Sequence, residues 1–196
     1  FLGLRNLTVI DDAVKMVRRQ KPDLRIEDIA LDEQPVFEML TRGNTEGVFQ
    51  FESGGMRRVI GNLRPDCFED LIAVISLYLP GPMDSITKYI NNRHHPEQVR
   101  YLHPRLEPIL SVTYGCIVYQ EQVMQIFREL AGYSLGRADV VRRAMSKKKH
   151  DVMEREREIF INGLTAPDGT VEVEGGARRG VPEETARAVF DDMYSF

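Results

Sequence analysis

The residues most suggestive of chemistry are a cluster of arginines and lysines between positions 136 and 150 of this 196-residue sequence. The six basic residues are Arg137, Arg142, Arg143, Lys147, Lys148 and Lys149, and Asp139 lies among them. The segment 137–149 therefore carries a net charge of +5, within a chain whose formal net charge is −4. Such a local positive field on an acidic protein indicates a compact anionic target, such as phosphate groups.

A helix is the expected scaffold for this cluster, because apolar and charged residues separate when they are placed at about 100° per residue. One arc holds Ala138, Val140, Val141, Ala144, Met145 and Val152. The other arc holds Asp139, Arg142, Arg143, Ser146, Lys147, Lys149 and His150, and Lys148 alone among the charged residues falls on the apolar side, from which its long stem could reach solvent. We expect the apolar arc to pack against the protein, the basic arc to face outward, and the helix to continue through residues 151–160.

Arg142 and Arg143 are the stronger candidates for specific phosphate contacts. A planar guanidinium group can bind two phosphate oxygens at once, whereas a lysine acts as a point charge. The alternative is a solvated helix face on which Asp139 pairs with Arg142 or Arg143 at helical spacing. The phosphate hypothesis fails if both arginines are held in internal ion pairs and face away from any cleft.

A second candidate group, Tyr119, Gln120 and Gln122, lies at the expected start of a helix. Aromatic and amide side chains beside a basic surface are suited to nucleobase contacts. The alternative is that the tyrosine covers the core and the glutamines face water. The four histidines and the two cysteines, Cys67 and Cys116, do not show the spacing of a zinc site, and phosphate-binding glycine motifs are absent from the sequence.

Composition places the chain among ordinary globular proteins, with 42% hydrophobic and 29% charged residues. The two distant cysteines predict buried thiols in a reducing compartment. The sequence shows neither a run long enough to span a membrane nor a signal peptide. Its abrupt apolar start at Phe1, and an end inside an expected helix, predict a piece of a longer chain.

The elements expected along the sequence are mostly helices, so the predicted class is mainly α. We expect helices over about residues 8–19, 35–40, 56–63, 68–78, 85–92, 104–110 and 120–131, then the basic helix, and a last helix from Pro182. Residues 48–51 alternate like a brief buried strand. Residues 165–174 contain a Pro-Asp-Gly turn followed by Thr-Val-Glu-Val, which predicts a small β-hairpin.

Six motifs follow one another along nearly the whole chain: FLGLRNLTVI at 1–10, GVFQFES at 47–53, LYLPGPM at 77–83, YGCIVYQEQVMQI at 114–126, AGYSLG at 131–136 and RRAMSKKK at 142–149. In this order they resemble the catalytic α subunits of bacterial DNA polymerase III, the family C replicative DNA polymerases. One departure is Leu79, because the family usually has arginine before Pro-Gly-Pro. We therefore assign no DNA or nucleotide contact to residue 79.

The resemblance implies a fragment with two parts. Residues 1–28 would be the C-terminal end of the palm domain, and residues 29–196 a helical fingers domain, truncated at its C-terminus, with the hairpin as a small insertion. The family's three metal-binding aspartates would all precede Phe1. The resemblance thus implies that Mg²⁺ is bound by the palm of the parent enzyme, that this chain contains neither catalytic residues nor metal ligands, and that it is inactive alone.

The resemblance also implies roles and partners. Arg142, Arg143 and Lys147 would bind the phosphates of the incoming dNTP during template-directed nucleotidyl transfer. Lys148, Lys149, Tyr119, Gln120 and Gln122 would be further candidates for the nucleotide pocket or for DNA. The implied partners are template-primer DNA, dNTPs, and, for the parent, the sliding clamp and other replisome subunits, in the cytoplasm and away from membranes.

Two alternatives from other classes remain open. A non-catalytic helical nucleic-acid-binding module would bind DNA with a steep salt dependence and would ignore nucleoside triphosphates. A helical protein-interaction scaffold would carry the lysine run as a solvated face. In that case, replacing Arg142 or Arg143 with alanine would change neither DNA binding nor nucleotide binding.

Overall fold

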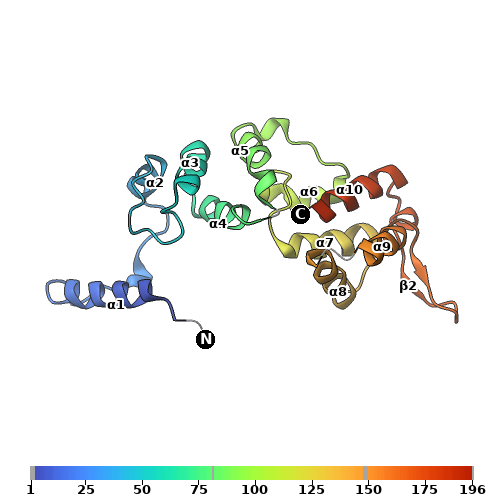
Figure 1. Ribbon diagram of the computed structural model, residues 1–196, viewed down its shortest axis with the longest axis horizontal. Helices are drawn as coiled ribbons and strands as arrows, with labels where there is room; N and C mark the ends of the chain where they lie inside the picture. Colours follow the sequence, from blue (N-terminus) through green and yellow to red (C-terminus); the bar gives the residue numbers. More distant parts are fainter. Residues whose placement is uncertain (1–2, 81, 148–149, 196) are drawn as a thin grey trace. The chain divides into compact units, whose positions relative to one another are not determined.

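The computed structural model of this chain describes residues 3–80, 82–147 and 150–195, and it is mainly helical with one small hairpin, as the sequence predicts (Figure 1). The α-helices are α1 Arg5–Arg18, α2 Gln34–Thr41, α3 Gly54–Leu63, α4 Phe68–Leu77, α5 Ile86–His94, α6 Glu107–Leu110, α7 Gln120–Ala131, α8 Leu135–Ser146, α9 His150–Asn162 and α10 Glu183–Ser195. Short 3-10 helices are η1 Ile26–Asp28, η2 Pro82–Ser85, η3 Pro96–Gln98, η4 Pro104–Leu106, η5 Ser111–Thr113 and η6 Ala177–Arg179. The strands are β1 Leu164–Thr165 and β2 Val171–Val173.

The chain divides into two compact units, Phe1–Val74 and Ile75–Phe196, and the division falls within α4. The predicted boundary between palm and fingers at residue 28 stays a prediction, since compactness alone does not identify either domain. In the described ranges, we find no helix whose length and apolar character would suffice to cross a membrane.

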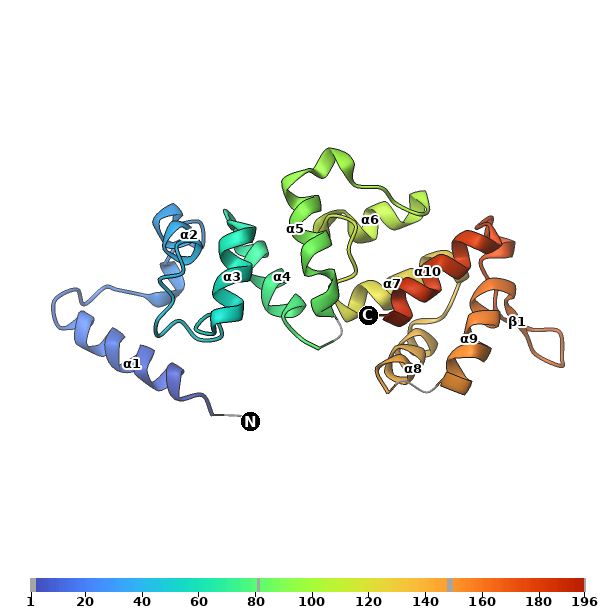
Figure 2. The same ribbon diagram turned by 45° about the horizontal axis from the view of Figure 1, so that its top comes forward.

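In the first unit, α2 packs against α3, and the buried residues on these helices are Phe37, Leu40, Met56, Ile60 and Leu63 (Figure 2). The α3 helix begins where Ser53 Oγ accepts a hydrogen bond from Met56 N at 3.2 Å. The α1 helix forms close to where the sequence predicts it. None of its described residues is buried, and Val9 and Met16 are 64% and 58% exposed.

The brief strand predicted at residues 48–51 is wrong, because this segment forms turns. Gln50 has a left-handed backbone with φ of 69°, which an extended strand does not allow. Phe51 is buried and its carbonyl oxygen accepts a bond from Thr45 Oγ1 at 2.7 Å, while Phe49 is 47% exposed. The alternation of apolar residues here therefore arises from a turn that buries Phe51 and leaves Phe49 exposed.

The second unit is built around α7, which packs against α8, α6 and α9, while α9 packs against α10 (Figures 1 and 2). Among its described residues, the aromatic rings of Phe127, Tyr133, Phe160 and Phe190 contact one another in the core. The Phe127 ring lies edge-on to the ring of Phe160, with centroids 5.3 Å apart, which is a favoured aromatic geometry. This packing joins the C-terminal half of α7 to α9 and α10.

The predicted hairpin is confirmed, with β1 and β2 antiparallel and a register irregularity between Leu164 and Thr165. Its base needs glycine at residue 163. Gly163 has φ of +87°, and a Cβ atom there would lie 2.4 Å from the carbonyl oxygen of Glu174. The end of β2 therefore approaches the residue that follows α9 more closely than a larger residue at position 163 would allow.

The predicted continuous helix from the basic cluster through residue 160 is wrong, because α8 ends at Ser146 and α9 begins at His150. Ser146 Oγ donates to the carbonyl oxygen of Arg142, and the amide of Lys147 bonds to Ala144 O in a tighter turn. Two separate helices allow α9 to pack against both α7 and α10.

The apolar arc of α8 is narrower than predicted. Ala138, Val141 and Met145 are buried, whereas Val140 is 65% exposed. Val152, placed on the same arc by the continuous-helix prediction, lies on α9 and is 41% exposed.

Candidate phosphate-binding cleft

A cleft of about 570 Å³ lies within the second unit, beside the C-terminal half of α8. Its walls come from Ser76, Leu79, Pro80 and Pro82, from the residues just before and at the start of α7, from the last turns of α8 and from the end of α10. Among the described residues that line it, Arg142 is the cation and Glu121 is the carboxylate. Leu79 also lines this cleft. An apolar side chain therefore lies at the position where the family that this sequence resembles usually has arginine.

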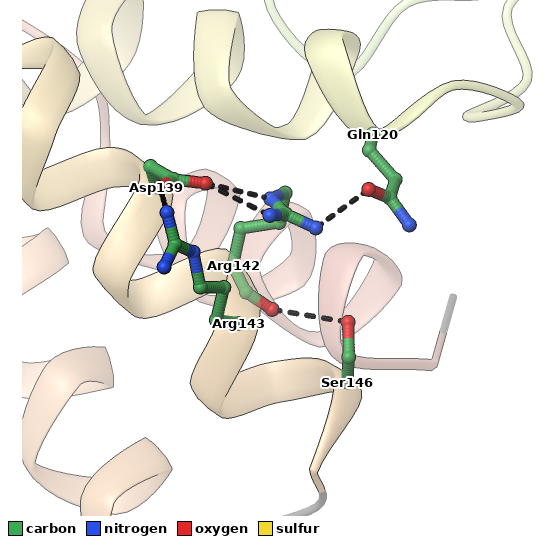
Figure 3. Close-up of polar contacts among 5 residues, drawn as sticks. All are labelled: Gln120, Asp139, Arg142, Arg143 and Ser146. Atoms are coloured by element: carbon green, nitrogen blue, oxygen red, sulfur yellow. Dashed lines mark hydrogen bonds and ion pairs between the residues drawn. The ribbon is translucent and has the colours of Figure 1, made fainter. Parts of the chain in front are cut away.

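Arg142 reaches this cleft with its guanidinium group held on two sides (Figure 3). Its Nε and Nη2 atoms donate to Asp139 Oδ1 at 3.2 and 2.8 Å, and its Nη1 atom donates to Gln120 Oε1 at 2.5 Å. The side chain is 19% exposed. Nη1 and Nη2 each carry a second N–H group, so donors remain for a ligand.

Arg143 points to the same carboxylate from the next position along the helix. Its Nη2 atom pairs with Asp139 Oδ2, and its side chain is 66% exposed. Hydrogen bonds from Arg143 and then Arg142 hold the pKa of the Asp139 carboxyl below its ordinary value. Both arginines are therefore ion-paired, but Arg142 faces a cleft, so the condition that would end the phosphate hypothesis is not met.

Of the three predicted lysines, Lys147 is the one within the described residues. It follows the last residue of α8 and is exposed to solvent. The helix dipole favours positive charge after the C-terminus of a helix, so a lysine at this position stabilises α8 even without a ligand. Lys148 and Lys149 lie outside the described residues.

Tyr119 and Gln120 both line this cleft, and their role as nucleotide-pocket residues stays a prediction. Tyr119 directly precedes α7 and is half-buried, and Gln120 is the first residue of that helix. Because a guanidinium group only donates hydrogen bonds, Gln120 must present its Oε1 atom to Arg142. Its Nε2 amide group is therefore directed elsewhere, which Figure 3 shows.

The predicted pocket candidate Gln122 is not brought to the cleft, because it is 4% exposed and its amide bonds inside the protein. Its Oε1 atom accepts from Val118 N at 2.9 Å and Tyr119 N at 3.0 Å. Its Nε2 atom donates to Ile109 O at 3.1 Å and Thr113 Oγ1 at 2.8 Å. Gln122 thus fixes the segment that leads into α7, and contributes to the cleft only through that segment.

The end of α10 also lines this cleft, and no local pattern in the sequence predicts this. Met193 and Tyr194 take part in its wall, although they lie some fifty residues further along the chain than Arg142. The hydroxyl group of Tyr194 lies 2.7 Å from His150 Nδ1, which joins the end of α10 to the start of α9. A long-range contact of this kind leaves no local pattern in a sequence.

Carboxylates suited to a pair of Mg²⁺ ions are not gathered at this cleft, since Glu121 is the acidic side chain among its described residues. In the first unit, Asp66, Cys67 and Asp70 place one potential ligand atom each within 4.8 Å of one another. Burial raises the pKa of the Cys67 thiol, which favours the protonated form. A protonated thiol is a poor ligand for a hard cation.

Comparison with known proteins identifies the chain. The family described as bacterial DNA polymerase III alpha subunit finger domain matches residues 6–168. A DNA polymerase III subunit alpha of Staphylococcus aureus (strain COL) is 48% identical over the whole chain, and one of Staphylococcus epidermidis is 46% identical. The chain spans 17% of the length of each of these relatives. It therefore belongs to the finger domain family of bacterial DNA polymerase III alpha subunits.

Proposed function

We propose that the cleft beside Arg142 receives the triphosphate of an incoming deoxynucleoside triphosphate during template-directed DNA synthesis. The observation that carries this proposal is the position of Arg142: it is the cation that lines the cleft, it is held in place by Asp139 and Gln120, and it keeps N–H donors for a ligand. Family membership supports it, because relatives of this chain are polymerase subunits by name.

Phosphoryl transfer depends mainly on positioning and on neutralising charge, and both fit a basic helix at a cleft. Arg142 would bind phosphate oxygens directly. Arg143, Lys147, Lys148 and Lys149 would add positive field for the triphosphate or for template-primer DNA. Tyr119 and Gln120 would lie toward the base or sugar, since aromatic and amide groups can contact either.

The remaining parts of the reaction are proposed to lie outside this chain. The residues at the cleft do not fit a pair of Mg²⁺ ions, so we propose that the metal ions and the catalytic aspartates belong to the palm of the polymerase. The same proposal includes the sliding clamp and other replisome subunits as partners of the whole enzyme, in the cytoplasm. Primer extension with this 196-residue chain alone should then show no template-dependent incorporation.

The direct test uses the full-length polymerase and steady-state incorporation of single nucleotides. Replacing Arg142 with alanine should lower kcat/KM for dNTPs by about tenfold or more, because a charged hydrogen bond to phosphate is lost. Arg143→Ala should have a smaller effect of the same sign. The matched control is Arg187→Ala, which removes an exposed arginine paired with Glu183 on α10.

Two results would contradict the proposal. Unchanged kinetics in both Arg142→Ala and Arg143→Ala would remove the cleft from nucleotide binding. A loss of DNA affinity with unchanged dependence on dNTP concentration, and with a steep salt dependence, would instead favour a site for the nucleic-acid backbone.

A further inference from the structure

Asp139 is unexpected in a site that only supplies positive charge. Its carboxylate lies between Arg142 and Arg143 and offsets part of their charge, next to the cleft that we assign to a triphosphate. A cluster built for attraction alone would gain from a neutral residue at this position. The arrangement of the three side chains indicates a different task for Asp139.

The helix places this carboxylate within reach of both guanidinium groups. Arg142 and Arg143 lie three and four residues after Asp139, and these are the positions that face each other on an α-helix. The two oxygens are divided between them: Oδ1 accepts both bonds from Arg142, and Oδ2 accepts from Arg143 (Figure 3). One carboxylate thereby sets the direction of two cations.

Gln120 completes the support from a second helix. It lies at the start of α7 and binds the side of the Arg142 guanidinium that Asp139 does not reach. An arginine side chain otherwise samples many rotamers, and fixing it after the ligand arrives reduces the gain from binding. Arg142 is therefore oriented before a ligand is present.

We propose that Asp139 is a positioning residue: it orients the guanidinium group of Arg142 toward the triphosphate of the bound nucleotide, and it fixes the guanidinium group of Arg143, which adds positive field beside the cleft. This inference rests on the function proposed above for the same cleft. Asp139 itself repels a triphosphate, so it cannot act by strengthening ground-state attraction. Its contribution is to hold the two cations where negative charge develops during nucleotidyl transfer. The loss of Asp139 should therefore lower kcat.

The test is steady-state single-nucleotide incorporation by the full-length polymerase carrying Asp139→Asn. We expect kcat to fall by about tenfold to a hundredfold, the scale of a misplaced catalytic geometry. We expect KM for the dNTP to stay equal or to decrease, because a negative charge near the triphosphate has been removed. The matched control is Glu183→Gln, which removes the carboxylate of the exposed Glu183–Arg187 pair on α10 and should leave both constants unchanged.

Two results would overturn the inference. One is a raised KM with unchanged kcat. The other is unchanged kinetics accompanied by a lower melting temperature, which would show that Asp139 serves only the stability of α8. If Arg142→Ala and Arg143→Ala impair incorporation but Asp139→Asn does not, this inference fails while the proposed function stands. If neither arginine substitution matters, the proposed function fails first.

A second measurement covers the case in which Asp139→Asn folds poorly. In the Arg142→Ala, Arg143→Ala double variant, adding Asp139→Asn should produce little further loss of kcat, because the residues through which Asp139 acts are already absent. A full additional loss in this background would show that Asp139 acts independently of both arginines, and would contradict the positioning role.

Discussion

Arg142 and Arg137 lie on the same helix, but they have different partners and therefore different roles. Arg137 pairs with Glu156 at 2.9 Å and with Glu172 at 3.6 Å, so it links α8 to α9 and to the hairpin strand. Arg142 pairs within its own helix and with Gln120 at the cleft. The total charge of the cluster therefore overstates what a ligand can meet, because Arg137 is used inside the protein.

The titration of Asp139 provides the first prediction. Hydrogen bonds from both arginines lower its pKa in the folded protein, so its ionised form contributes stability at every pH above the ordinary value. That stability should be lost only as the pH falls through the lowered pKa, below the usual aspartate value of about 3.9. An NMR titration of the Asp139 carboxyl carbon would measure its pKa in the folded protein.

The control for this titration is to remove each of the two arginines that bind Asp139. Arg143→Ala and Arg142→Ala should each raise the Asp139 pKa toward its ordinary value, because hydrogen bonds from Arg143 and from Arg142 hold that pKa down. An Asp139 pKa at or above the ordinary value in the unaltered protein would contradict the ion pairs that the structure shows.

At the scale of elements, Gln122 determines how the chain enters α7. Its amide bonds to Val118, Tyr119, Ile109 and Thr113 within a buried site. Gln122→Ala should lower the free energy of unfolding by about 2–4 kcal/mol, because buried polar groups would lose their partners. Gln125→Ala, an exposed glutamine on the same helix, should change it by less than about 0.5 kcal/mol.

Denaturant unfolding followed by circular dichroism would compare these two glutamine variants. Equal effects of the two substitutions would contradict the structural role of Gln122. Tyr119 lies on the segment that Gln122 fixes, so Gln122→Ala should also disturb the cleft wall.

The sequence predicts best those elements that are determined by residues close together in the chain. The α7 helix has the predicted bounds 120–131, and the hairpin follows its Asp-Gly turn. The break between α8 and α9 was missed because residues 136–160 have continuous helical character. Helix packing in three dimensions decides where such a chain turns, and periodicity cannot report it.

The candidate site was predictable to the same extent. Tyr119, Gln120 and Arg142 are candidates by their chemical types, and the structure brings all three to one cleft. Gln122 is a candidate of the same chemical type, but it lies two residues beyond Gln120 on the helix, and the rotation between these positions turns its side chain from the cleft into the core. Tyr194 could not be found, because its place in the cleft depends on how α10 folds back.

At the scale of the whole molecule, each compact unit contains one of the two cysteines, so the reactivity of each thiol measures the folding of its own unit. Cys67 belongs to the first unit and is half-buried, and Cys116 belongs to the second and is 1% exposed. Burial raises the pKa of the Cys116 thiol to about 11. At pH 8 a thiol reagent should therefore modify Cys67 long before Cys116, which should react only when the second unit unfolds.

Mass spectrometry of labelled peptides would follow this reaction, and a Cys67→Ser variant would isolate the slower site. The burial of Cys116 also has a pH signature. Stability from the neutral thiol is present below its unfolded pKa and is lost as the pH rises toward 11. Rapid labelling of Cys116 in the folded protein would contradict the packing of the second unit.

The measurement that tests the central claim most directly is a structure of the full-length polymerase with template-primer DNA and an incoming dNTP. We predict that triphosphate oxygens lie at about 2.7–2.9 Å from the Arg142 guanidinium, the usual length of a charged hydrogen bond, while Asp139 still holds its other edge. A triphosphate bound away from this cleft, with Arg142 bonded only to Asp139 and Gln120, would contradict the account.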